Sequence, residues 1–463
     1  MKTVGIIAEY DPFHNGHLYQ MQEARRCAGA DYVVVAMSGD FVQRGEPALL
    51  DKWVRARMAL QAGADLVLEL PVRVSTGSAE YFARGGVSLL SSLGVVDALS
   101  FGYESMTDPA LDPALNPALD PALDPALDPA FNPALDPAFI PSDAPSDALS
   151  DSFIQKELRS LEQAADFFSR EETDTYREEL KKLLSSGMTY AQARVEAYTA
   201  TEDEDTAVPA DLLKSPNNIL AIEYLKAIRQ LHSTLSVVPV PRLGAGYHDP
   251  ALPQPETSDS TSSPLRGQTP KSLPASASGI RSALSRKESV EPYMPQDAYA
   301  LMMEQLTSGR SLILSDLDLL MHEALLRKKD HLEEYLDVGV DLANRIRSLL
   351  SGYTGYESFA MQLKTRQVTL TRVKRALLHI LLGIRSTAAP AAYVRVLGFR
   401  KTAQPLLHRI SQESSVSMIT KLPKEAPEGL EEDLNAAHMW EMLVCHKTGT
   451  PLCNEYQRQL VIL

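Results

Sequence analysis

The sequence of 463 residues predicts an α/β fold, in which an N-terminal doubly wound parallel sheet is joined to a C-terminal α-helical domain. Short β-branched runs alternate with helical patterns over residues 1–102, and helical patterns dominate from residue 298 onward. Strand, helix and strand in repeated succession are typical of a parallel sheet with helices on both faces. At about 150 residues per domain, the length suggests two or three domains.

The expected strands of the N-terminal part carry apolar residues without polar alternation, as in a sheet buried on both faces. They occupy residues 3–8, 32–36, 65–70 and 97–101. The helical patterns between them are rich in Ala, Leu, Arg and Gln and cover residues 16–29, 50–62 and 78–93;. Further helices are expected within 152–200 and over 216–233, 298–307, 314–327, 330–351, 355–363 and 368–384, with a short mixed region near 390–420.

A low-complexity insertion, predicted to be largely disordered, interrupts the α/β part at residues 107–151. Eight tetrads of the form Asp/Asn-Pro-Ala-Leu/Phe run from residue 108 to 139. Proline at every fourth position removes backbone donors and disfavours helix at each preceding residue. We interpret the segment as a surface loop expanded by repeat slippage, with a partner-binding arm as the alternative. A second loop, rich in Ser, Thr and Pro, is expected near 250–275;.

Composition excludes several classes of protein. Three scattered cysteines do not make a disulfide framework, which points to a reducing compartment and hence to the cytoplasm;. The chain has no signal-peptide pattern and no run of about 18 apolar residues, so no membrane association is expected;. A formal net charge of −15 argues against general, charge-driven binding to nucleic acid;.

The most informative local sequence is Glu9-Tyr10-Asp11-Pro12-Phe13-His14-Asn15-Gly16-His17, which follows the first strand and leads into the first helix. Ligands of parallel α/β sheets bind at this edge, and the N–H groups of a helix N-terminus favour anions. His14 and His17 can face one bound group and stabilise charge on phosphoryl oxygens, while Gly16 lets a phosphate approach. The alternative is that His14 caps a turn and His17 packs on the helix. Zinc is not expected because a third ligand at a recognisable spacing is missing.

The segment from Val4 to Leu18 resembles the opening of the nucleotidyltransferase-like superfamily, whose His-x-Gly-His motif binds the phosphates of ATP. Six later segments extend the match, at residues 37–48, 52–53, 101–102, 215–220, 242–249 and 276–281. Together they closely resemble the bacterial tRNA(Met) cytidine acetate ligase family over nearly the whole chain, apart from 107–150 and 250–272.

The resemblance implies ATP-dependent activation of acetate to acetyl-adenylate, followed by acetylation of the exocyclic amine of the wobble cytidine in elongator tRNA(Met). His14 and His17 are the expected catalytic residues, and Mg²⁺ is expected to accompany ATP. The residues expected to bind ATP by this resemblance are Ile7, Ala8, Glu9, Tyr10, Phe13, His14, Asn15, Gly16, His17, Gly102, Asn217, Asn218, Arg242, Leu243, Ser278 and Arg281. Which of the two asparagines contacts ATP stays open, and Gly279 departs from the expected residue after Ser278.

Several of these residues also have simpler explanations. Gly102 could be a turn glycine, Arg242 a surface arginine, and Ser278 and Arg281 part of an ordinary helix start. The Gln43-Arg44-Gly45 segment follows the second strand and could reach the substrate, with no step assigned to it.

A basic island predicts an RNA partner. Between residues 358 and 412 there are ten Lys or Arg residues and no Asp or Glu, although the chain as a whole is acidic;. The residues expected to contact RNA are Lys364, Arg366, Arg372, Lys374 and Arg375. The alternative is a solvated helix face balanced by acids elsewhere in the fold. Tyr353, Tyr356, Tyr393 and Phe399 flank the island and could stack on bases, although at least two of them should pack in the core.

The expected domains are therefore a nucleotide-binding α/β domain, 1–106 with 152–290, the insertion 107–151, and a helical, basic tRNA-binding domain over 291–463. Two other functions stay open. A small-molecule adenylyltransferase would use the same histidines without the basic island, and a non-catalytic RNA-binding protein would use the island without the histidines. The oligomeric state is not predicted.

Overall fold

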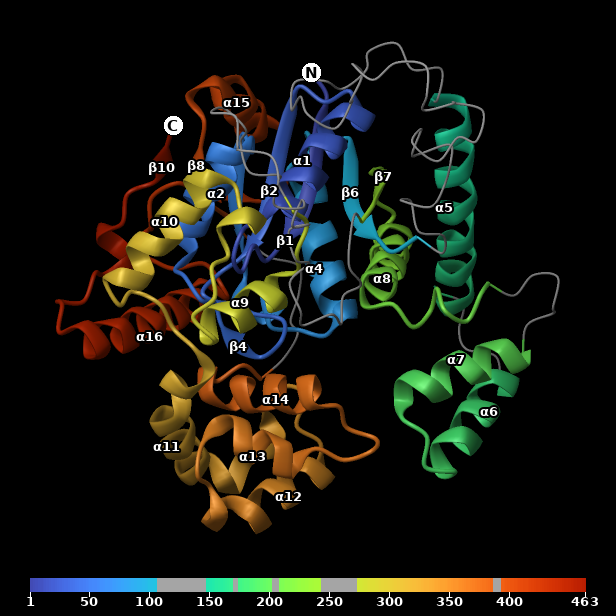
Figure 1. Cartoon of the computed structure of the whole chain (residues 1–463), viewed down its shortest axis with the longest axis vertical. Helices are drawn as coiled ribbons and strands as arrows, with labels where there is room; N and C mark the ends of the chain where they lie inside the picture. Colours follow the sequence, from blue (N-terminus) through green and yellow to red (C-terminus); the bar gives the residue numbers. More distant parts are fainter. Residues whose placement is uncertain (106–146, 170–173, 202–207, 243–272, 386–392) are drawn as a thin grey trace, which may run out of the picture.

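The computed structural model describes residues 1–105, 147–169, 174–201, 208–242, 273–385 and 393–463. The described part is built around one eight-stranded sheet with helices on both faces (Figure 1). The strand order is β10-β8-β5-β2-β1-β6-β7, with β9 beside β8, and β3 and β4 form a separate hairpin. The strands are β1 Thr3–Ala8, β2 Tyr32–Ser38, β3 Phe41–Val42, β4 Glu46–Pro47, β5 Leu66–Leu70, β6 Ala98–Tyr103, β7 Ser236–Pro241, β8 Tyr393–Phe399, β9 Ser417–Ile419 and β10 Val461–Ile462.

The predicted fold class is confirmed. Strand β1 pairs in parallel with β2 on one side and β6 on the other, so the strand order reverses direction at β1. The helices are α1 Asn15–Ala28, α2 Lys52–Ala62, α3 Val72–Ser75, α4 Ala79–Ser92, α5 Asp147–Ser169, α6 Asp174–Ser185, α7 Tyr190–Thr201, α8 Pro216–Gln230, α9 Ala277–Ser285, α10 Gln296–Thr307, α11 Asp318–Lys328, α12 Val340–Leu349, α13 Tyr356–Leu363, α14 Leu370–Leu382, α15 Gln404–Glu413 and α16 Leu430–Thr448. None of these helices combines the length and apolar character needed to cross a bilayer.

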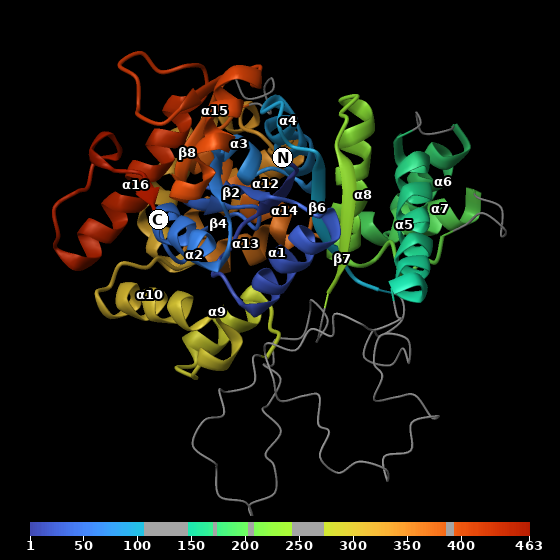
Figure 2. The same cartoon turned by 90° about the horizontal axis from the view of Figure 1, so that it is seen from above.

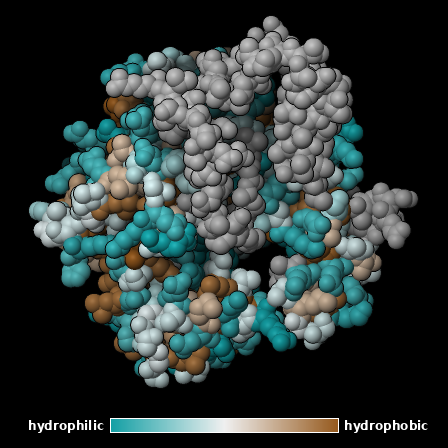
Figure 3. Space-filling view, viewed as in Figure 1, coloured by the Kyte–Doolittle hydropathy of each residue, from teal (hydrophilic) through white to brown (hydrophobic). Residues whose placement is uncertain are grey.

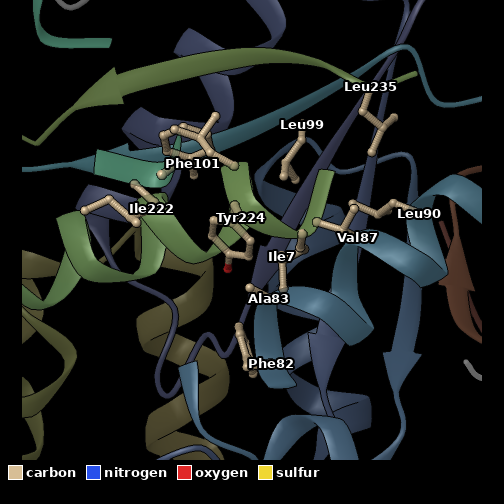
Figure 4. Close-up of a cluster of buried hydrophobic side chains, with 14 of the residues drawn as sticks. Ile7, Phe82, Ala83, Val87, Leu90, Leu99, Phe101, Ile222, Tyr224 and Leu235 are labelled. Carbon is tan, nitrogen blue, oxygen red and sulfur yellow. The ribbon is translucent and has the colours of Figure 1, made fainter. Parts of the chain in front are cut away.

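Successive residues of the central strands belong to two different cores. Val33 and Val35 of β2 pack with side chains of α1 and α2 on one face. Val34 and Ala36 pack on the other face, with α4 and α8. Figure 4 shows this second core, where Ile7 of β1 meets side chains of both helices. Because both faces are covered, the strands carry apolar residues at most positions, which explains the absence of polar alternation.

Both ends of residues 291–463, which were expected to form a helical domain, pack with the α/β part of the chain. Helix α10 packs against α2, and β8 inserts beside β5 as an antiparallel strand of the main sheet. Strand β10 then pairs with β8. Strand β8 is buried over most of its length because it joins the sheet, and such long-range pairing leaves no signal in the local pattern;. The helical unit itself comprises α11 to α14, which lie together below the sheet in Figure 1 and share a third core.

The segment between β6 and α8 contributes helices α5, α6 and α7. Helix α5 packs against α8, and α6 packs against α7, as Figures 1 and 2 show. Since α5 begins at Asp147, the last five residues of the predicted insertion belong to a helix, and residues 106–146 lie outside the described part, as do 243–272 of the second loop. Figure 3 shows hydrophobic side chains interspersed with hydrophilic ones over the visible faces of the helical unit and of α6 and α7.

The β3–β4 hairpin joins the α/β part to the helical unit. Gly45 in its turn has φ +76°, and a Cβ atom there would lie 2.5 Å from the backbone N of Arg375 in α14. The Tyr356 hydroxyl lies 3.1 Å from the Gly45 carbonyl oxygen and 2.7 Å from that of Lys374. The Lys374 ammonium pairs with the Glu46 carboxylate at 2.7 Å. The hairpin and α14 are therefore in direct backbone contact.

The close approach at Gly45 predicts a large effect of a single methyl group. Gly45→Ala should lower the free energy of unfolding by about 3 kcal/mol, because the new Cβ meets rigid backbone in addition to the cost of positive φ. Gly383→Ala is the matched control: Gly383 also has positive φ, +81°, but open space around it, so about 1 kcal/mol is expected;. Urea denaturation of both variants measures the difference, and equal losses would contradict the contact.

Candidate functional site

A cleft of about 640 Å³ lies at the carboxyl end of β1, where the strand order of the sheet reverses. This is the position at which doubly wound folds bind ligands. The residues that line the cleft are Ile7, Ala8, Glu9, Tyr10, Asp11, His14, His17, Gln20, Gln43, Arg44, Ala79, Phe82, Pro216, Asn217, Ile219, Leu220, Tyr224, Arg242, Ser276, Ala277, Ser278, Arg281, Thr371 and Arg375. They come from both sides of β1 and from α14 of the helical unit.

His14 and His17 stack at the start of α1, with ring centroids 3.6 Å apart and an interplanar angle of 21°. His14 is the N-cap residue, and its Nδ1 accepts the N–H of Gly16 at 3.1 Å. Nδ1 of His17 accepts the N–H of His14 at 3.3 Å. A neutral imidazole whose Nδ1 accepts a hydrogen bond carries its proton on Nε2. Each ring therefore has an Nε2–H donor left for a ligand in the cleft.

Burial keeps both rings neutral. The pKa of His14 is lowered well below its ordinary value, first by burial and then by the nearby charges of His17, Arg242 and Arg281. Burial, with a smaller contribution from Arg242, lowers the pKa of His17 to about 3. At neutral pH the pair therefore donates hydrogen bonds without carrying charge, and the positive charge of the cleft comes from arginine.

The lowered pKa of His17 predicts that acid destabilises the protein. Between pH 6.5 and about 3 the unfolded chain binds a proton on this residue that the folded chain does not, so stability is lost as the pH falls through that window;. From pH 7 to pH 5 the loss from His17 should be about 2 kcal/mol. Urea unfolding of the wild type and of His17→Gln at both pH values tests this. The variant should lose less stability, and parallel losses would contradict the assignment.

Positive charge and a helix N-terminus face the histidines. Arg242 follows β7 and Arg281 lies on α9, whose N-cap Ser276 accepts the N–H of Gly279 at 3.0 Å. The hydroxyls of Ser276 and Ser278 lie 3.1 Å apart. Arg281 is anchored by Asp11, with 3.2 Å between its Nη1 and the carboxylate. Histidine donors, arginines and the start of α9 together suit a polyphosphate.

Ten of the residues predicted to bind ATP line this cleft: Ile7, Ala8, Glu9, Tyr10, His14, His17, Asn217, Arg242, Ser278 and Arg281. Five others lie behind its wall: Phe13, Asn15, Gly16, Gly102 and Asn218. Leu243 lies outside the described residues. Most of the segments expected to bind ATP thus contribute to the cleft, but neighbouring residues within them lie in different positions.

Four of the five residues behind the wall have structural partners. The side chain of Asn218 makes two hydrogen bonds with the backbone of Glu104. Its Oδ1 accepts the Glu104 N–H at 2.8 Å, and its Nδ2 donates to the Glu104 carbonyl oxygen at 3.0 Å. The side-chain amide of Asn15 donates to the backbone carbonyls of Leu273 and Pro292, at 3.1 and 2.9 Å. The Gly16 N–H is used by His14, and Phe13 is buried edge-on to Tyr10. Of the two asparagines, only Asn217 lines the cleft.

Gly102 is not a turn residue, because β6 continues to Tyr103. A Cβ at this position would lie 3.6 Å from Cγ of Arg242. This distance is an ordinary van der Waals contact, so a Cβ at this position would fit beside the arginine side chain.

Other wall residues were not among those expected to bind ATP, although Gln43 and Arg44 belong to the segment that was expected to reach the substrate. Gln43 and Arg44 come from the hairpin, Tyr224 from α8, and Thr371 and Arg375 from α14. Gln43 and Arg44 are partly exposed, and the hairpin places them at the wall. Tyr224 fits an ordinary apolar helix pattern, since its ring packs on Phe101 at 5.9 Å.

The basic island does not form one continuous surface. Lys374 is buried and paired with Glu46, and Arg375 pairs with Asp337 at 3.3 Å. Arg395 is also buried, and Arg409 pairs with Glu413. Lys364, Arg366 and Arg372 are exposed on the helical unit. Lys374 does not contribute to an exposed basic surface, because its side of α14 faces the hairpin. Tyr356 and Tyr393 are buried, as expected for at least two of the flanking aromatic residues.

A buried group of charges, the Lys52 cluster, lies behind the site and consists of Lys52, Asp40, Glu69, Arg395 and Glu455. The Lys52 ammonium lies 2.7 Å from Glu69, 3.4 Å from Glu455 and 3.5 Å from Asp40. Arg395 of β8 pairs with Glu69 at 3.1 Å and also with Glu455. The cluster connects β5 and α2 to the returning C-terminal segment. Among the described residues, no three His, Cys, Asp or Glu side chains are arranged to hold a metal ion.

Comparisons with known proteins find relatives that match most of the chain. Residues 1–117 and 152–451 match the HIGH Nucleotidyl Transferase family. A protein of Acetivibrio thermocellus named tRNA(Met) cytidine acetate ligase is 32% identical over 437 residues, which cover 91% of this chain and 88% of that protein. A protein of the same name from Syntrophotalea carbinolica is 34% identical over 434 residues, covering 92% and 86%.

Two crystal structures of Thermotoga maritima TmcAL share the fold. The form bound with alpha-thio ATP superposes with a TM-score of 0.75 at 23% identity, and the apo form with 0.77 at 24%. In both cases the match covers 100% of each chain.

Proposed function

This chain belongs to the HIGH nucleotidyl transferase family and, within it, to the tRNA(Met) cytidine acetate ligases, and from that membership we propose that it acetylates the wobble cytidine of elongator tRNA(Met) with acetate and ATP. The observation that carries the proposal is the stacked pair His14 and His17, whose Nε2–H donors face a cleft that Arg242 and Arg281 also line. Such donors stabilise charge that develops on phosphoryl oxygens.

The first step is adenylation of acetate. A carboxylate oxygen of acetate attacks the α-phosphorus of ATP, and the new O–P bond gives acetyl-adenylate. Pyrophosphate leaves with the electron pair of the broken bond. His14, His17 and the N-terminus of α9 donate to the phosphoryl oxygens, and Arg242 and Arg281 balance the negative charge. Asn217 and Ser278 extend the same wall. Activation is needed because free acetate has a poor leaving group.

Mg²⁺ is expected with ATP and would neutralise charge on its phosphates. Two carboxylates line the cleft, Glu9 and Asp11. Asp11 is already engaged by Arg281 and by the N–H of Leu49 at 2.7 Å. The ligands of such an ion would therefore come mainly from the phosphates and water.

One labelling experiment tests the function. The wild type and His14→Ala are incubated with labelled acetate, ATP and total bacterial tRNA. Label in tRNA that depends on both ATP and His14 is the expected result. Incorporation of AMP into a small product would favour the adenylyltransferase instead, and tRNA binding without turnover would favour the non-catalytic RNA-binding protein.

The helical unit, α11 to α14, is proposed to hold the tRNA through its exposed cations. The double variant Arg366→Glu/Arg372→Glu should bind tRNA about tenfold more weakly at low salt and show a smaller salt dependence, because phosphate contacts release counterions. Lys421→Glu/Lys424→Glu, at two exposed lysines outside this unit, changes the net charge equally and should bind nearly as the wild type does. Filter binding at several salt concentrations measures both, and equal weakening would contradict this surface.

A further inference from the structure

The two sides of the cleft differ in chemistry. Beyond β1 toward β6 and β7 lies Arg242, which follows β7 and is suited to polyphosphate. The start of α9, which also lines the cleft, is suited to the same group. Toward β2 the wall is made by the hairpin and by α14, with Gln43, Arg44 and Arg375. If the triphosphate occupies the first side, the second side is left for the molecule that accepts the acetyl group.

Glu9 stands between the two sides and is available to a ligand. Its Oε1 accepts the N–H of Gln43 at 2.7 Å, which holds the carboxylate against the hairpin. No ion pair engages it within the described part of the chain, whereas Asp11, the other acid of the wall, is bound by Arg281. Burial raises the pKa of Glu9, which Gln43 and Arg44 only partly offset. A carboxylate in this setting accepts a proton more readily than an exposed one.

Gln43 provides a hydrogen-bond donor next to the Glu9 acceptor. Its side-chain Nε2 is buried and has no partner within the described residues, although the residue lines the cleft. Buried donors are nearly always satisfied, so an unsatisfied one beside a cleft indicates a ligand acceptor. Glu9 and Gln43 therefore offer an acceptor and a donor side by side. This pattern fits a base with an exocyclic amine next to a ring nitrogen, as in cytosine and adenine.

The helical unit favours cytosine of a nucleic acid over the adenine of ATP. The same hairpin that carries Gln43 contacts α14 through Gly45, and Thr371 and Arg375 of α14 reach the cleft beside it. A nucleotide chain bound along the helical unit would thus enter from the Gln43 side, with Arg44 and Arg375 near its phosphates. Enzymes that modify a base read its Watson–Crick edge in such a pocket after it leaves the stack.

We propose that Glu9 and Gln43 form the pocket for the acceptor cytosine, where Glu9 accepts a hydrogen of the exocyclic amine and Gln43 donates to the ring nitrogen beside it. The inference rests on the proposed function and extends it to the second step. The amine nitrogen attacks the acetyl carbon of acetyl-adenylate, a C–N bond forms, and the bond from that carbon to the phosphate oxygen breaks. AMP leaves with the electron pair, and the amine proton passes to the Glu9 carboxylate and then to water.

The test separates the two half-reactions in the full-length protein. Adenylation is followed without tRNA as acetate-dependent exchange of labelled pyrophosphate into ATP. Transfer is followed in single turnovers from preformed acetyl-adenylate to tRNA. Glu9→Gln should slow transfer about 100-fold and change exchange less than about threefold, since a general base contributes on the order of 10²-fold or more. Gln43→Ala should slow transfer about tenfold with normal exchange.

Exchange activity in each variant also reports that the cleft is folded. Glu80→Gln is the matched control, because Glu80 is an exposed acid in the first turn of α4, next to the wall residue Ala79. It should leave both reactions unchanged. Normal transfer in both Glu9→Gln and Gln43→Ala would overturn the proposal, and so would a raised KM for ATP in Gln43→Ala, which would assign the pair to adenine. If Glu9→Gln loses pyrophosphate exchange as well as transfer, the transfer rate of Gln43→Ala decides whether the pocket binds the acceptor cytosine. Absence of both reactions in the wild type would instead refute the proposed function.

Discussion

The His14→Asn variant is expected to lose acetate-dependent pyrophosphate exchange by about 10²–10³-fold while keeping its stability, which is one of the two largest effects we predict. Asparagine can still accept the Gly16 N–H as the N-cap of α1, so the helix start is preserved;. It lacks the Nε2–H that reaches into the cleft. Loss of one preorganised donor to a developing phosphoryl charge typically costs a factor of this size.

The comparison with His14→Ala separates catalysis from folding. Alanine removes the donor and the N-cap together, so this variant should show the same loss of exchange and, in addition, about 1 kcal/mol of lost stability. His408→Ala, at an exposed histidine on α15, should be unchanged in both measurements. Exchange kinetics and urea unfolding provide the two readouts. Full exchange activity in His14→Asn would show that His14 only caps the helix, the alternative that the sequence left open.

Lys52→Met should produce the largest loss of stability, about 3–5 kcal/mol at pH 7. The Lys52 ammonium is fully buried among three carboxylates. Removing it leaves Glu69 and Glu455 paired with Arg395, and leaves Asp40 without an ion pair among the described residues. Breaking a buried ionic group by deleting one partner typically costs this much, because the remaining charge stays desolvated. Lys182→Met, which breaks the exposed pair with Glu179 at 3.0 Å, should cost less than about 0.5 kcal/mol;.

The pH dependence of the Lys52→Met defect checks its cause. Burial already raises the pKa of Asp40 to about 6, although Lys52 opposes the shift. Without Lys52, folded-state carboxylates bind protons more readily than unfolded ones, so lowering the pH from 7 toward 5 should reduce the difference from the wild type. Urea unfolding at both pH values measures it. A defect that stays constant would point to lost packing of the lysine chain.

Much of the α/β core could be predicted from the sequence because its signals are local. Runs such as residues 32–38 need apolar side chains on both faces, and α1, α2 and α4 lie within two residues of their predicted ends. The histidine pair was identified by its place between a strand and a helix, and the structure stacks the two rings there. The spacing of residues along a helix or strand is short-range information, which the backbone geometry converts directly into structure.

The tertiary structure alone decided what depends on distant partners. Strand β8 joins β5 across more than 300 residues, and the Lys52 cluster gathers charges from residues 40 to 455. From the sequence, Lys374 was expected to be an exposed cation, but in the folded chain it pairs with Glu46. Asn217 and Asn218 are the same type of residue in adjacent positions. The packing of the chain decides that Asn217 lines the cleft while Asn218 binds the backbone of Glu104. Local pattern determines which elements form, whereas the burial and pairing of a charge depend on which elements meet, and that is settled only when the whole chain packs.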